Sequence, residues 1–463
     1  MMYIKPYYLD CLAHASYLIV DEKTGTAVVV DPQRDVDQYV HDAAEQGWTI
    51  RHVLLTHCHA DFLAGHLELR QRTGAEIHIG ARAVTEFRVT SMTEDHPLAL
   101  GRTRLRFLET PGHTPESVCI LVDDLEKDAQ RPQAVLTGDT LFIGDVGRPD
   151  LFASAGLSAE ELAGQLFESL HGKLLTLPDE TLVYPAHGAG SMCGKNLSND
   201  TVSTIGAQRA TNPALQAMSR EAFIGMVTSG QPAAPAYFAG VSQLNLRERP
   251  LLEEILARSL NPLSLADLLA AQQAGARVID VRDPDAYCRN HLRGSMNIGL
   301  CGKYATWAGS LLNPEQPLAI LADPGREREA VTRLGRIGFD SVMGYLEGGP
   351  AALTSPEAPT ATLERIDGNE LRRRMEAGDP HLVLDVRSPA EHASWRIPGS
   401  LNVPLTDLAG RMAELPQDRH LMVHCLGGYR STIACSMLKE HGYDRLTDLA
   451  GGIGAWTGPT ESD

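Results

Sequence analysis

The second half of the chain contains an internal duplication, and this feature restricts its possible folds more than any other. The segment VIDVRDP at residues 278–284 reappears as VLDVRSP at residues 383–389. GSMN at residues 294–297 reappears as GSLN at 399–402, with the same offset of 105 positions (385 − 280 and 399 − 294). Because a constant offset across separate segments indicates two copies of one unit, we expect two homologous domains here.

The chain is long enough for a further domain ahead of the two copies. A single core seldom grows beyond about 300 residues, whereas the chain has 463 residues. The proline-rich segment 231–236 cannot continue a helix and is expected to mark the exit from the first domain. The segment 350–362, rich in Ala, Pro, Ser and Thr, is predicted to link the two copies. We therefore predict domains at residues 1–245, 260–350 and 363–463.

Charge and composition narrow the possible partners and compartment. The 41 basic and 59 acidic residues give a net charge of −18, which disfavours binding to a phosphate backbone. No apolar stretch approaches the roughly 20 residues that span a bilayer, and residues 1–10 lack the apolar core of a secretory signal. The eight cysteines include no CxxC pair, so they suggest neither a disulfide framework nor a zinc ribbon. We expect a cytoplasmic protein without nucleic-acid or membrane partners.

Polar side chains follow several predicted strands of the first domain. Short β-branched or leucine-rich runs alternate with longer mixed segments, which is typical of an α/β fold. Four of these runs are followed by polar residues, at Asp31, His57, Asp139 and His187, and His113 follows a tight Pro-Gly turn. Because sites in open α/β sheets form at the carboxyl ends of strands, these side chains should converge along one edge. The pattern predicts a metal site.

The same residues resemble the metallo-β-lactamase superfamily over about residues 1–245. The resemblance implies an αββα sandwich followed by two rhodanese-like α/β domains. The segments TPGHTPES at residues 110–117 and GDVGRPD at residues 144–150 are similar to the persulfide dioxygenase branch of this superfamily. That branch implies one Fe(II) per chain as the cofactor, with the metal ligands His57, His113 and Asp139.

Phe62 departs from the pattern of the two-metal hydrolases in this superfamily. It ends the motif THCHADF at residues 56–62, where those hydrolases carry another histidine. Two histidines and one carboxylate with open coordination positions are what oxygen-activating ferrous iron requires, whereas zinc has no accessible redox state. This departure favours iron. A zinc site with His59 as a third histidine stays an alternative, as does a plain packing role for Phe62.

Further residues are expected near the metal. Cys193, in the glycine-rich loop 188–196, is predicted either to carry sulfur or to pack in the core. Arg148 and Lys195 are predicted to bind the acidic groups of a thiol carrier or an oxyanion product, with a solvated surface charge as the alternative for each. Three residues match second-metal positions of the superfamily and are expected to orient ligands and substrate through hydrogen bonds: His59, Asp61 and His187.

The later of the two copies carries a candidate nucleophile. The segment CLGGYRS at residues 425–431 lies between an apolar run and a helical pattern. Backbone N–H groups at a helix start surround the sulfur of Cys425, and Arg430 adds positive charge, so a thiolate is favoured. This segment resembles the active loop of rhodanese sulfurtransferases. The earlier copy has Asp323 instead of the cysteine, so we predict a rhodanese-like domain without the nucleophile.

The whole chain is similar to persulfide dioxygenases fused to rhodanese domains. The resemblance implies oxidation of a low-molecular-weight thiol persulfide by O2 to sulfite, with sulfur transfer at Cys425 that yields thiosulfate. Such an activity would serve sulfide detoxification, and we expect a homo-oligomer. The alternatives are a zinc-dependent thioester hydrolase of the glyoxalase II type and a sulfur-binding scaffold whose first domain is inert.

Overall fold

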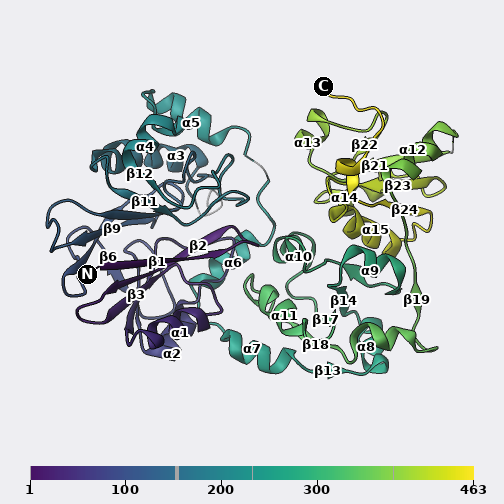
Figure 1. The fold of residues 1–463 in the computed structure, drawn as a ribbon, viewed down its shortest axis with the longest axis horizontal. Coiled ribbons are helices and arrows are strands. Elements are labelled where there is room, and N and C mark those ends of the chain that lie inside the picture. Colours follow the sequence, from purple (N-terminus) through teal and green to yellow (C-terminus); the bar gives the residue numbers. More distant parts are fainter. Residues whose placement is uncertain (1, 152–155, 232, 379) are drawn as a thin grey trace. The chain divides into compact units, whose positions relative to one another are not determined.

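The chain folds into two compact units in the computed structural model, which describes residues 2–151, 156–231, 233–378 and 380–463. One unit comprises Met1–Glu254 with Gly335–Gly338, and the other comprises Ile255–Leu334 with Phe339–Asp463. Both units mix helices and strands, as predicted (Figure 1). The three predicted domain boundaries divide the chain more finely than this and stay predictions. No helix among the described residues is long and apolar enough to cross a membrane.

The first sheet of the first unit holds six strands in the order β1 to β6. β1, β2 and β3 form antiparallel pairs, whereas the pairs from β3 to β6 are parallel. Parallel neighbours bring the carboxyl ends of β3 and β4 to one edge of the sheet. The elements of this layer are β1 (Met2–Leu9), β2 (His14–Asp21), β3 (Thr26–Val30), β4 (Thr49–Leu55), β5 (Glu76–Gly80), β6 (Thr90–Met92), α1 (Asp37–Glu45) and α2 (His66–Thr73).

The second sheet has the order β12-β11-β10-β9-β8-β7, in which only β10 and β11 pair in parallel. Ser158 caps the start of helix α3: its side chain accepts a hydrogen bond from the Glu161 N–H in a capping box. The elements of this layer are β7 (Leu98–Ala99), β8 (Thr103–Glu109), β9 (Val118–Asp124), β10 (Ala134–Gly138), β11 (Leu182–Pro185), β12 (Ser203–Thr204), α3 (Ala159–Phe167), α4 (Ile205–Thr211) and α5 (Arg220–Thr228). Two further helices follow, α6 (Phe238–Asn245) and α7 (Leu252–Ser259), and α7 belongs to the second unit from Ile255 onward.

Alternating side chains on the strands build a four-layer αββα sandwich (Figure 1). On β4, Val53 packs in a cluster with side chains of α1 and α2, whereas the next residue, Leu54, packs between the two sheets. On β9, Ile120 faces the first sheet and Leu121 packs in a cluster with residues of α3, α4 and α5. This period of two is what a strand buried on both faces requires. The predicted fold class is confirmed.

The second unit contains two parallel five-stranded sheets with the same strand order, β13-β18-β17-β14-β16 and β20-β24-β23-β21-β22. The sequence duplication therefore corresponds to a structural one. The first copy holds β13 (Pro262–Leu263), α8 (Leu265–Gln273), β14 (Arg277–Asp280), α9 (Pro284–Arg289), β15 (His291–Leu292), β16 (Met296–Asn297), α10 (Tyr304–Leu311), β17 (Leu318–Leu321), α11 (Glu327–Gly335) and β18 (Val342–Leu346). The second holds β19 (Thr360–Ala361), β20 (Glu364–Ile366), α12 (Gly368–Glu376), β21 (His381–Asp385), α13 (Pro389–Ser394), β22 (Leu401–Asn402), α14 (Leu408–Arg411), β23 (His420–His424), α15 (Arg430–Glu440) and β24 (Leu446–Leu449).

The repeated sequence motif forms the same buried ion pair in both copies. Arg282 donates to both carboxylate oxygens of Asp280, and Arg387 donates in the same way to Asp385. Both carboxylates are buried at the ends of β14 and β21. The pair persists in the copy that lacks the cysteine, so its role is to hold the strand end rather than to react.

Candidate metal centre and sulfur-transfer loop

Two strand ends and one turn of the first unit bring the predicted metal ligands together. His57 follows β4, Asp139 follows β10, and His113 lies in the turn between β8 and β9. One ligand atom from each of these side chains lies within 4.8 Å of the others. Asp139 Oδ2 is 3.4 Å from His113 Nε2 and 3.9 Å from His57 Nε2. All three side chains are buried, so an ion held by them would be shielded from solvent.

Hydrogen bonds on the far sides of the rings fix which nitrogen of each histidine is free. The Thr56 hydroxyl donates its proton to Asp31 Oδ2 at 2.8 Å, so it must accept from His57 Nδ1 at 3.0 Å. His113 Nδ1 donates to the Arg148 carbonyl at 2.8 Å. Burial and the neighbouring imidazoles hold the pKa of His57 well below its ordinary value. The Nδ1 atoms of both rings are thus engaged, and their Nε2 atoms face the Asp139 carboxylate.

This arrangement fits a bound divalent cation. Among the described residues, neither carboxylate oxygen of Asp139 has an N–H or O–H donor, and the Cys193 thiol beside it is only a weak donor. A buried carboxylate that faces lone pairs instead of donors is strongly destabilising unless a positive charge lies between them. Two imidazole nitrogens and one carboxylate match the ligand set of mononuclear non-haem iron sites and also suit zinc.

Asp31 lies next to the candidate centre and contacts Thr56 and His59. It has a φ of 50°, which is rare outside glycine. Its Oδ1 accepts from the Thr56 N–H at 2.8 Å and lies 3.0 Å from His59 Nε2. Burial lowers the pKa of His59, but the Asp31 carboxylate outweighs this effect and raises it. His59 therefore pairs with Asp31 and belongs to neither group of ligand atoms formed at this centre.

A second group of potential ligands adjoins the first. Asp61, His187 and Cys193 also offer one ligand atom each within 4.8 Å of one another, and all are buried. His187 Nε2 is 3.5 Å from Asp61 Oδ2 and 3.5 Å from Asp139 Oδ1. His187 Nδ1 donates to the Ala13 carbonyl at 3.1 Å, so Nε2 is the nitrogen that faces the carboxylates of Asp61 and Asp139. The structure thus brings the predicted residues Asp61, His187 and Cys193 to the edge of the candidate centre.

Cys193 and Phe62 make this edge of the candidate centre less polar. Burial and the carboxylates of Asp139 and Asp61 raise the pKa of Cys193 well above its ordinary value, so its thiol stays protonated. Phe62 is buried, with its ring centroid 4.0 Å from that of His14 and 4.5 Å from that of His59. An aromatic ring therefore occupies the position where the two-metal pattern requires an imidazole.

The two predicted anion-binding residues have different surroundings. Arg148 is buried and donates two hydrogen bonds of 2.7 Å to the Asp150 carboxylate. Lys195 Nζ donates to the backbone carbonyls of Met226 and Ser229, at the end of α5. Arg148 thus already holds an internal carboxylate, and Lys195 caps a helix end. Their predicted role in binding substrate stays a prediction.

Two residues that were not expected to take part hold the loop between His57 and Ala64, and of these only Glu116 lies in a quoted motif, TPGHTPES. Asn245, at the end of α6, donates to the carbonyls of His59 and Phe62 and accepts from the Ala64 N–H. Glu116 accepts from the Cys58 N–H at 2.8 Å. Asn245 lies more than 180 positions from its partners, so only the tertiary structure reveals this role.

The candidate nucleophile of the second unit lies between β23 and α15. Cys425 is buried, and its Sγ accepts a hydrogen bond from the Gly428 N–H at 3.1 Å. Gly428 has a φ of 83°, which lets the loop curl around the sulfur. Arg430 forms two hydrogen bonds, of 2.7 and 2.8 Å, with Glu391. The loop presents a backbone donor to the sulfur, as predicted, but the charge of Arg430 is paired.

The first copy contacts this loop within the second unit. Tyr429 Oη donates to the Gly299 carbonyl at 2.7 Å, and Arg277 forms two hydrogen bonds with Glu440 at the end of α15. In the first copy itself, Asp323 follows β17 at the position of the cysteine. It is exposed. This copy thus lacks a thiol at that position and packs against the copy that has one.

Comparisons with known proteins agree with this architecture. Residues 9–187 match the metallo-beta-lactamase superfamily, and residues 263–355 and 367–459 each match the rhodanese-like domain. A hydroxyacylglutathione hydrolase of Rhodospirillum rubrum is 32% identical over 234 residues, which cover 50% of this chain and 80% of the hydrolase.

Two other relatives point to sulfur chemistry. The mitochondrial persulfide dioxygenase ETHE1 of Mus musculus is 31% identical over 213 residues, which cover 45% of this chain and 74% of that protein. A sulfurtransferase of Allochromatium vinosum is 39% identical over 94 residues, which cover 20% of this chain and 88% of the sulfurtransferase. The hydrolase and the dioxygenase are about equally similar to the first part of the chain, so the site itself must decide between them.

Proposed function

Because this chain belongs to the metallo-β-lactamase superfamily and carries two rhodanese-like domains, we propose that it oxidises a low-molecular-weight thiol persulfide with O2 and transfers sulfur at Cys425. The observation that carries the oxidation is the geometry of His57, His113 and Asp139, in which the Nε2 atoms of two imidazoles with engaged Nδ1 atoms face a buried carboxylate. A bound Fe(II) would supply the redox electrons and the open coordination positions that this chemistry needs.

The protein residues would hold and shield the reacting groups. Thr56 and the Arg148 carbonyl fix the two imidazoles, which keeps both Nε2 atoms directed at the site. Phe62 excludes water from one side, which would protect a reactive intermediate from side reactions. The small-molecule sulfur substrate is supported by the dioxygenase and sulfurtransferase relatives.

Thioester hydrolysis at a zinc centre is the second candidate. It is favoured by the adjoining group of Asp61, His187 and Cys193, which could hold a second ion beside the first, and by the hydrolase relative. Phe62 argues against it, because a second ion would lack the imidazole ligand that the two-metal hydrolases have at this position. The deciding experiment is to purify the protein anaerobically, determine iron and zinc, and assay two substrates. O2 uptake with glutathione persulfide without hydrolysis of lactoylglutathione supports the dioxygenase, and the opposite result supports the hydrolase.

We further propose that the two activities are consecutive. A persulfide at Cys425 would be attacked by sulfite at its outer sulfur, which breaks the S–S bond, forms thiosulfate and returns the Cys425 thiolate. A covalent connection between the domains raises the effective concentration of one product near the other site.

Replacement of Cys425 by Ser tests this sequence of reactions. We expect the variant to consume O2 at close to the wild-type rate while its product changes from thiosulfate to sulfite, as measured by ion chromatography. Cys435→Ser is the matched control, because Cys435 is also buried in the second copy but lies within α15. An unchanged thiosulfate yield from Cys425→Ser would contradict the proposal.

A further inference from the structure

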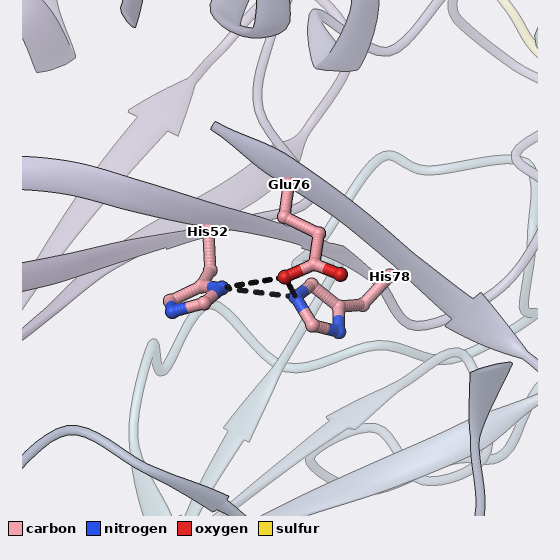
Figure 2. A group of neighbouring side chains, drawn as sticks. All are labelled: His52, Glu76 and His78. Carbon is pink, nitrogen blue, oxygen red and sulfur yellow. Dashed lines mark hydrogen bonds and ion pairs between the residues drawn. The ribbon is translucent and has the colours of Figure 1, made fainter. Parts of the chain in front are cut away.

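Three potential ligands lie on neighbouring strands of the first sheet, apart from the residues of the candidate centre (Figure 2). His52 belongs to β4, and Glu76 and His78 belong to β5. In the parallel pairing of these strands, His52 is the partner of Glu76. Since side chains two positions apart on a strand share one face, Glu76 and His78 point to the same side. All three side chains therefore meet over one face of the sheet.

The distances among the three ligand atoms match those around a metal ion. His52 Nδ1 and His78 Nε2 share a hydrogen bond of 3.0 Å, and Glu76 Oε2 is 3.8 Å from each of these nitrogens. When an ion binds, the ring that donates this bond would carry its proton on its other nitrogen instead. A triangle with sides of 3.0, 3.8 and 3.8 Å has its centre about 2.1 Å from every corner. Zinc lies about 2.0–2.2 Å from imidazole nitrogens and carboxylate oxygens. An ion could thus reach all three atoms with little movement of the side chains.

Neighbouring residues orient the carboxylate of Glu76 and favour the charge states that a cation needs. Thr90 on β6 donates a hydrogen bond to Glu76 Oε1, so Oε2 is the oxygen that faces the imidazoles. This hydrogen bond lowers the pKa of Glu76, and burial lowers the pKa of His52 and brings that of His78 to about 4. At neutral pH the group offers one carboxylate and two neutral rings.

The site is open to solvent on one side. The Glu76 side chain is 51% exposed, whereas those of His52 and His78 are 17% and 5% exposed. An ion can therefore enter past Glu76 and keep water on its remaining coordination positions. Arg51 and Arg88 add positive charge nearby, as their effects on His52 and Glu76 show, and this moderates the expected affinity.

We propose that His52, Glu76 and His78 form a second, separate metal site that binds a divalent transition-metal ion of the zinc class. Two imidazoles and a single carboxylate select such ions over Mg²⁺ and Ca²⁺, which prefer sites made of oxygen ligands. The bound ion ties β4 to β5, and β4 leads directly to His57. The proposal does not depend on which reaction the candidate centre performs.

Zinc titration of the full-length, iron-loaded protein tests the proposal. Calorimetry in the presence of a competing chelator would be compared for wild type, His52→Gln and Glu76→Gln. Both replaced side chains are at least partly exposed, so these variants should fold. We expect wild type to bind one more Zn²⁺ than either variant, or the variants to bind that ion at least about tenfold more weakly. Iron content and O2 uptake should be unchanged in Glu76→Gln.

His41→Gln is the matched control, because His41 is an exposed histidine beside the carboxylate of Glu45 on α1 but lacks a second imidazole. It should bind zinc as wild type does. Zinc should also raise the unfolding temperature of wild type and His41→Gln more than that of Glu76→Gln, since an ion stabilises only the state that binds it. Equal zinc stoichiometry and affinity in wild type, His52→Gln and Glu76→Gln would overturn the proposal.

Discussion

Replacement of Thr56 by Val removes one oxygen atom that connects Asp31 to His57. The Thr56 hydroxyl donates to Asp31 Oδ2 and accepts from His57 Nδ1, and all three side chains are buried. Valine has nearly the same shape, so the change leaves two buried polar atoms without a partner. At about 1–3 kcal/mol for each unpaired group, the free energy of unfolding should fall by about 2–4 kcal/mol. Asp31 Oδ1 still accepts the hydrogen bond from the Thr56 N–H in the variant. The expected loss of stability is therefore smaller than the sum of two full penalties.

The same change should weaken metal binding, because His57 loses the partner that keeps its proton on Nδ1. Outer hydrogen bonds of this kind contribute about 10–100-fold to metal affinity. Iron affinity would be measured by chelator competition under anaerobic conditions, and stability by urea unfolding of the apo-protein. Thr181→Val is the control, because Thr181 is buried in the same unit but its hydroxyl donates to the Pro132 carbonyl rather than to a residue of the candidate centre. If Thr56→Val loses stability but binds iron within twofold of wild type, the assignment of the free Nε2 is wrong.

Two further predictions concern the two sites separately. Phe62→His should bind a second zinc ion beside Asp61 and His187 and gain hydrolysis of lactoylglutathione, whereas Phe62→Leu should do neither; metal analysis and the hydrolysis assay check this. Burial raises the pKa of Glu391, but the hydrogen bonds and charge of Arg430 and the hydrogen bonds of Ser388 together lower it from 4.5 to about 2. The ionised carboxylate therefore stabilises the fold above pH 4.5, and this contribution is lost as the pH falls toward 2. Glu391→Gln should therefore be less stable than wild type by about 1 kcal/mol at pH 7, and urea unfolding should show this difference disappear near pH 2.

The sequence predicted those features that depend on local order along the chain. His57 and Asp139 follow buried strands, and the carboxyl ends of such strands meet, so their convergence could be expected. The repeated segments likewise predicted two sheets of one topology. In each case a short segment contains both the strand and the residue that it positions.

Features that depend on distant contacts could not be predicted. The left-handed backbone of Asp31 and its pairing with His59 require three segments to be placed at once. Asn245 holds the metal-site loop from a separate helix. No periodicity or spacing records these partners.

The hydrogen bond from Tyr429 to the Gly299 carbonyl gives the cysteine-free copy a reason to persist. Tyr429 immediately precedes Arg430, within the same turn that surrounds Cys425. A domain without the cysteine thus contacts the loop that carries Cys425 in the other copy. A chain that lacks residues 260–350 would lose this contact, so the proposed sulfur transfer at Cys425 should be slower even when its terminal domain is well folded.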